Sequence, residues 1–141
     1  MTTTTAPSYL STLMAPGPAL LRLSLRLDAV ITTVNGLAYL ALAGPLESLL
    51  GLDTAIGIPI GIFLTLYGLA VALIGTRPTI NPTATRLVIA ANTTWVLASL
   101  TALFITDTLD LNLIGSIWTV MQAGTVGGFA ALQYLGLRKA Q

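Results

Sequence analysis

The sequence predicts an all-α membrane protein built as a four-transmembrane-helix bundle. Of its 141 residues 55% are hydrophobic and 8% are charged, whereas soluble domains carry about 25% charged residues. Four apolar segments are long enough to cross a bilayer, which takes roughly 20 helical residues for about 30 Å of hydrocarbon. Polar side chains inside these segments recur every three or four residues, and this spacing places them on one face of a helix.

The expected elements follow the chain in order. Residues 1–17 are rich in Thr, Ser and Pro and are expected to form a disordered N-terminal tail. Residues 18–141 are expected to form a single four-helix transmembrane domain, and Pro18 is well placed to start a helix before the first span. The four spans are expected at about 27–44, 54–75, 87–106 and 113–137. The segments between them, "GPLESLLGLD", "TRPTINPTAT" and "DTLDLN", carry residues typical of turns.

The basic residues predict the orientation. All of them lie before span one, between spans two and three, or after span four: Arg22, Arg26, Arg77, Arg86, Arg138 and Lys139. The charged residues of the opposite loops are all acidic, namely Glu47, Asp53, Asp107 and Asp110. Because Lys and Arg favour the cytoplasmic side, both termini of this multi-pass protein are expected to be cytoplasmic, in the cell (plasma) membrane.

The chain also looks duplicated. "RLDAVITTVNGLAYL" (26–40) aligns with "RLVIAANTTWVLASL" (86–100) and shares, among others, Arg26/Arg86, Thr33/Thr93 and Leu37/Leu97. Chance matching between apolar segments is the alternative, but the matching arginines favour duplication. The prediction is two tandem helical hairpins in parallel, related by an axis along the membrane normal.

The polar residues of three spans form the candidate site. Asp28, Thr32, Asn35 and Tyr39 share one face of span one. The predicted ligand-binding residues are Thr32, Asn35, Tyr39, Asn92, Trp95, Ser99, Trp118 and Gln122. They would either hydrogen-bond the helices to one another, for about 0.6 kcal/mol each, or line a pocket for a lipophilic small molecule. Trp118 would also suit an interfacial anchor.

Asp28 is the only carboxylate inside a predicted span. An ionisable residue within a membrane suggests a functional site, and under an enzymatic function Asp28 is the candidate catalytic residue, acting as a general acid. The structural alternative is an ion pair with Arg26 or Arg86.

Several classes of site are excluded or unsupported. The chain has no Cys and no His, which excludes disulfides, His-ligated haem and Cys/His zinc sites. Its carboxylates are too scattered to predict a metal site, and no cofactor is expected. No basic cluster indicates nucleic-acid binding.

Two pairs of glycines predict close helix packing. Gly57/Gly61 and Gly124/Gly128 would join the two halves of the chain or form the interface of a homo-oligomer.

The segments "LRLDAVITTVNGLAYLALAGPL", "ANTTWVLASL" and "ALQYLGLRK" resemble uncharacterised actinobacterial four-span integral membrane proteins. In size and helix count the chain is loosely similar to DoxX-like proteins. This resemblance implies a fold and a membrane location, and it transfers no catalytic residue.

The leading hypothesis is a non-enzymatic protein of the plasma membrane. It would be an accessory or binding protein for a lipophilic small molecule or a larger membrane complex. The alternative is a membrane-embedded enzyme that performs acid/base or cyclisation chemistry on a lipophilic, polyketide- or terpenoid-like substrate.

Overall fold

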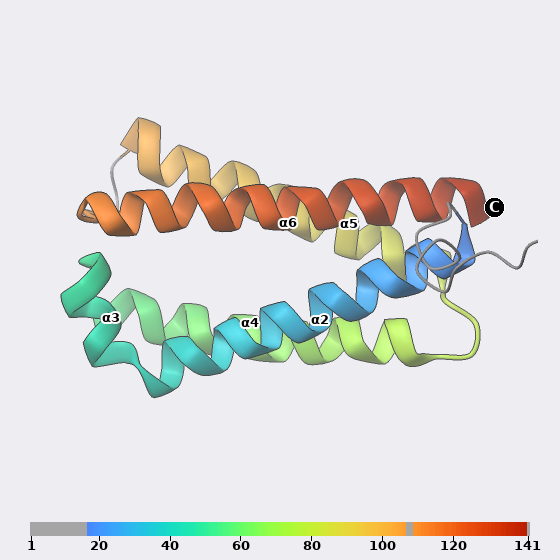
Figure 1. Ribbon diagram of the computed structural model, residues 1–141, viewed down its shortest axis with the longest axis horizontal. Helices are drawn as coiled ribbons and strands as arrows, with labels where there is room; N and C mark the ends of the chain where they lie inside the picture. The colour runs from blue at the N-terminus through green and yellow to red at the C-terminus, as the bar shows by residue number, and fades with distance from the viewer. Residues whose placement is uncertain (1–16, 107–108, 141) are drawn as a thin grey trace, which may run out of the picture.

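The computed structural model describes residues 17–106 and 109–140, and these residues are almost entirely helical (Figure 1). The prediction of an all-α chain is confirmed for this part, in which no residue lies in a strand. Residues 1–16 of the predicted tail, and Asp107 in an acidic loop, lie outside the described residues. The elements are α2 (Pro18–Ala41), α3 (Ala43–Leu50), α4 (Thr54–Thr76), α5 (Pro82–Thr101), the π-helical turn η1 (Ala102–Thr106) and α6 (Leu113–Ala140).

Local signals in the sequence explain where the helices begin. Pro18 opens α2, because a first-turn residue needs no backbone N–H for the helix. The Asp53 side chain accepts a hydrogen bond from the Ala55 N–H (2.9 Å) at the start of α4. The Asn81 side chain accepts one from the Ala84 N–H (3.1 Å) at the start of α5. These caps satisfy backbone donors that have no partner within the helix.

The segment expected as a turn after span one is mostly helical. Helix α3 covers Ala43–Leu50 and is bent by 92° from α2. Pro45 is compatible with this helix because it lies in its first turn. The helix ends at Gly51, whose positive φ of 76° is a typical helix terminator. The chain therefore changes direction after α2 and continues as a short helix, where a turn was expected.

The four long helices form two hairpins that lie against each other. Helix α2 packs along α4, and α5 packs along α6 (Figure 1). The two hairpins meet mainly where α2 contacts α6, and α4 has little contact with α5. Side chains that point inward from all four helices therefore face a common interior.

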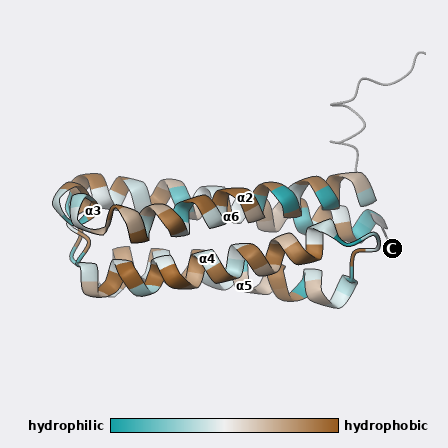
Figure 2. Cartoon of the chain, turned by 90° about the horizontal axis from the view of Figure 1, so that it is seen from below, coloured by the Kyte–Doolittle hydropathy of each residue, from teal (hydrophilic) through white to brown (hydrophobic). Residues whose placement is uncertain are grey.

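The distribution of polarity is inverted relative to a soluble protein. Large apolar side chains are exposed along every long helix, for example Val34, Leu66, Leu97 and Met121, and Figure 2 shows apolar residues along most of α4. Helix α4 and the continuous segment Pro82–Thr106 are each long and apolar enough to cross a membrane, and the bent pair α2 and α3 adds a third if it counts as one span. These helices indicate a membrane-embedded protein.

Candidate functional site

A cavity of about 240 Å³ lies between the two hairpins. An engineered cavity of about 150 Å³ is enough to hold benzene, so this one has room for a small molecule or for one end of a longer one. Seven of the eight predicted binding residues line it, and Ser99 is the exception. The lining side chains are Ile31, Thr32, Asn35, Tyr39, Phe63, Leu64, Tyr67, Ala91, Asn92, Trp95, Trp118, Met121, Gln122, Thr125, Val126 and Phe129.

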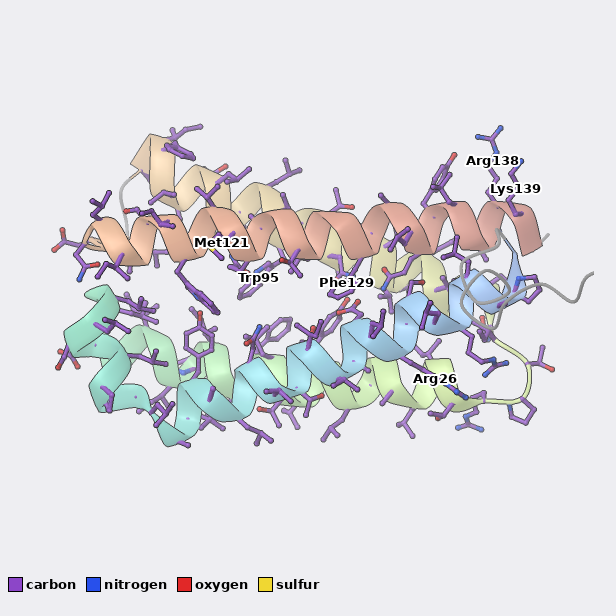
Figure 3. The ribbon with its side chains drawn as sticks, viewed as in Figure 1. Arg26, Trp95, Met121, Phe129, Arg138 and Lys139 are labelled. Atoms are coloured by element: carbon purple, nitrogen blue, oxygen red, sulfur yellow. The ribbon has the colours of Figure 1, made fainter. Side chains whose placement is uncertain are left out.

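Aromatic rings make up much of the wall. Phe63 stacks on Tyr67 with ring centroids 5.6 Å apart and on Trp95 at 5.9 Å. Trp118 donates its indole N–H to the Tyr39 hydroxyl oxygen over 2.8 Å. In Figure 3, Trp95 points into the space between the hairpins. Stacking and hydrogen bonding together hold these rings in defined orientations.

Ser99 lies beside the cavity rather than in its wall. The Trp95 indole N–H donates to Gln122 Oε1 (2.8 Å), and the Gln122 amide donates to Ser99 Oγ (3.3 Å). Ser99 lines a smaller neighbouring cavity of about 190 Å³, which shares Tyr39, Trp95 and Gln122 with the first. It therefore supports a residue of the main cavity and does not face into it.

Asn35 differs from the other amides of the site. It lines the cavity, and within the described residues its side chain forms no hydrogen bond. Asn92 and Gln122 are both held by neighbouring side chains. The Asn35 amide therefore keeps both its donors and its acceptor for a molecule in the cavity.

Asp28 sits at the centre of a carboxylate cluster, which we define as Asp28, Thr32, Asn92 and Gln133. Asp28 and Gln133 are both 0% exposed. Thr32 donates to Asp28 Oδ1 (2.8 Å), and the amides of Asn92 (2.8 Å) and Gln133 (2.7 Å) donate to Oδ2. The Asn92 amide also donates to Gln133 Oε1 (3.0 Å). One carboxylate thus binds α2, α5 and α6 together.

The ion pair that we considered for Asp28 is not formed. All its partners in the described part of the chain are neutral. Arg26 instead donates to the Gly75 carbonyl (3.2 Å) at the end of α4, and Arg86 is exposed. An arginine gains more by meeting helix-end carbonyls near water than by entering the apolar interior.

Asp28 does not line the cavity. Thr32 and Asn92 belong to both the carboxylate cluster and the cavity wall. A molecule in the cavity would therefore meet these two side chains and not the carboxylate itself. The role of Asp28 as a general acid stays a prediction.

Two aromatic wall residues on α4 were not predicted from the sequence. Phe63 and Tyr67 lie one helical turn apart on α4. The Tyr67 hydroxyl donates to Asn92 Oδ1 (2.9 Å) and lies 3.2 Å from the Val88 carbonyl oxygen. Their four-residue spacing within an apolar span was the available signal.

No cluster of three potential metal ligands occurs in residues 17–106 and 109–140. Comparison of the chain with known protein families, with curated proteins and with solved structures finds no match.

Proposed function

We propose that this chain is an integral plasma-membrane protein that binds a lipophilic small molecule in the cavity between its hairpins. The observation that carries the proposal is the free Asn35 amide in a wall made mainly of apolar and aromatic side chains. Ligand pockets combine such walls with a few oriented polar groups. A side chain that served only to join helices would have a partner across the interface.

The proposal includes a four-span topology. The four long helices would cross the membrane as two hairpins, with both termini in the cytoplasm. The single-sided placement of the basic residues supports this orientation. The two hairpins would be parallel repeats, and the positions related by the repeat include Thr32/Asn92 and Asn35/Trp95, all of which line the cavity.

A homo-oligomer through Gly124 and Gly128 is part of the proposal. These glycines are exposed on α6, and a Cβ on either would meet no atom of the described chain within 4 Å. Gly61 of the other pair instead packs against Tyr39 and Leu40. A second copy of the chain, or a larger membrane complex, would have access to the α6 face.

Native mass spectrometry of the detergent-purified protein tests ligand binding. We expect the wild-type protein to retain a small molecule, and Asn35→Leu to lose it, because the substitution removes the free amide and fills part of the cavity. Val34→Leu is the matched control, since the neighbouring Val34 is 58% exposed on the outer surface. The same spectra report whether the chain is a monomer or an oligomer.

If each of the three folded proteins showed only the mass of its own chain, ligand binding would be contradicted. A purely structural role for the polar residues would then be favoured. Retention of the same molecule by Asn35→Leu would show that it binds elsewhere. The first result would shift the search to a partner protein, and the second would shift it to another site on this chain.

The alternative function is a membrane enzyme in which Asp28 supplies a proton. Its support is the direct hydrogen bonding of Asp28 to Thr32 and Asn92, both of which line the cavity. Under this alternative, Asp28→Asn would retain a molecule of a different mass from that in wild type. If Asp28→Asn retained a molecule of the same mass as wild type, binding without catalysis would remain the proposed function.

A further inference from the structure

The cavity offers more free hydrogen-bond acceptors than free donors. Most of the polar side chains in its wall donate their protons to other protein groups: Thr32, Tyr67, Asn92, Trp95, Trp118 and Thr125. The two tryptophans have no acceptor oxygen, but the oxygens of the other four side chains keep lone pairs for a ligand. The donors that remain are on Asn35, Tyr39 and Gln122.

The acceptor character is strengthened by Asp28. Three hydrogen bonds from Thr32, Asn92 and Gln133 end on its two carboxylate oxygens, and an ionised carboxylate can accept all three. A hydroxyl or amide that donates to an anion becomes a better acceptor at its own oxygen. The buried carboxylate therefore makes the Thr32 and Asn92 oxygens in the cavity wall stronger hydrogen-bond acceptors.

Among the described residues, no positively charged group pairs with this carboxylate. None of the described residues that line the cavity is a lysine or an arginine, and Asp28 pairs with no cationic side chain of the described chain. An uncompensated charge in a membrane interior is costly. A positive charge in the cavity would lower that cost, whereas a negative one would raise it.

The aromatic wall also suits a positively charged ligand. Tyr39, Phe63, Tyr67, Trp95 and Trp118 all line the cavity, and the faces of aromatic rings attract cations. Trp95 and Tyr67 flank Phe63 in nearly parallel stacks, at interplanar angles of 10° and 11°.

We propose that the ligand of this cavity is a lipophilic cation, an amine in its ammonium form attached to a compact apolar body. This inference rests on the proposed function, because it names the chemical class of the molecule bound there. The ammonium group would face Thr32, Asn35 and Asn92, and the apolar body would lie against the rings.

Three probes with the same apolar cage and different charge test the proposal: 1-adamantylammonium, the neutral 1-methyladamantane and adamantane-1-carboxylate. The protein is placed in zwitterionic phosphatidylcholine nanodiscs, and empty nanodiscs correct for partition into lipid. Tryptophan fluorescence reports binding, because both tryptophans of the protein, Trp95 and Trp118, line the cavity.

We expect the cation to bind at least 10-fold more tightly than the neutral probe, and the anion to bind most weakly. Equal or tighter binding of the neutral probe would overturn the cation preference and leave the proposed binding function intact. Tighter binding of the anion would also overturn it. If no probe binds, the inference fails. If native mass spectrometry also shows the wild-type protein without a retained molecule, the proposed binding function fails as well.

The variant Asp28→Asn tests the source of the preference. The substitution removes the charge with little change of shape, so the ratio of cation to neutral affinity should fall toward one. Glu47→Gln is the matched control, since it removes an exposed carboxylate on α3, and it should leave the ratio unchanged. A full preference in folded Asp28→Asn would exclude the carboxylate as its cause. If that variant does not fold, the wild-type comparison of the three probes still decides the proposal.

Discussion

At the scale of single residues, Asp28 shows how a charge is held inside an apolar helix assembly. Three neutral donors from α2, α5 and α6 surround the carboxylate. A buried charge is tolerated only when its lone pairs are satisfied, and removal of one partner of such a group is more destabilising than removal of an ordinary hydrogen bond. The carboxylate cluster therefore couples the fold of the two hairpins.

Gln133→Leu should lower the free energy of unfolding by about 2 kcal/mol, because hydrogen bonds to charged groups contribute about 1.5–3 kcal/mol. Gln122→Leu on the same helix is the control. It removes a neutral and partly buried hydrogen bond to Trp95, so it should cost about 1 kcal/mol. Thermal unfolding in detergent measures both variants, and an equal or larger loss for Gln122→Leu would contradict this account of the carboxylate cluster.

The sequence predicted which polar residues share a face of one helix, but not which residues meet between helices. Helical spacing placed Thr32, Asn35 and Tyr39 on one face, and all three line the cavity. The partners of Asp28 were not predictable in this way, because Gln133 is 105 positions away in the chain and reaches it only through packing of α6 on α2. The sequence also suggested Arg26 and Arg86 as partners, but Arg26 donates to a helix-end carbonyl and Arg86 is exposed.

At the scale of elements, glycines let α2 and α4 approach closely. A Cβ at Gly61 would lie 2.9 Å from side-chain atoms of Tyr39 and Leu40. A Cβ at Gly68 would meet the Thr33 hydroxyl and would lie 2.8 Å from the Thr33 backbone nitrogen. Small residues of this kind are typical of packed membrane helices, and here they let Thr33, Tyr39 and Leu40 of α2 approach α4 closely.

Gly68→Ala should therefore destabilise the protein by about 1–3 kcal/mol, as overpacking of a filled interface does. The backbone of α2 would have to move away from the added methyl group. Gly44→Ala on α3 is the matched control, because its Cβ would meet nothing within 4 Å, and it should keep or raise the midpoint of thermal unfolding. A stable Gly68→Ala protein would show that the two helices can separate without cost.

The elements differ in how well the sequence predicted them. Helix α4 covers Thr54–Thr76 where a span was expected at 54–75, because Asp53 and the apolar run mark it clearly. Helix α3 was expected as a turn, since its Gly44 and Pro45 are typical of turns. Its first turn tolerates Pro45, and its path is set by the link from Asn112 to the Leu49 and Leu50 carbonyls (2.9 and 3.1 Å).

At the scale of the whole molecule, charge is separated between the two ends. Figure 3 shows Arg26, Arg138 and Lys139 toward one end. Gly17 lies at that end too, because a Cβ on it would be 4.0 Å from the Lys139 carbonyl oxygen. The start of α2 and the end of α6 thus lie on the same side of the molecule. The positive-inside rule predicts that this side faces the cytoplasm.

Single cysteines test this orientation in intact cells, because the natural chain has none. Ser48 is exposed on α3, and Thr79 is exposed between α4 and α5, so either position should accept a cysteine without disturbing packing. A maleimide that cannot cross membranes should label Ser48→Cys from outside and should label Thr79→Cys only after the cells are opened. Each variant is the control for the other, since both thiols react once the membrane is permeabilised. The reverse pattern would place the basic end outside, and labelling of both positions from outside would rule out a hairpin of α2 and α4 that crosses the membrane.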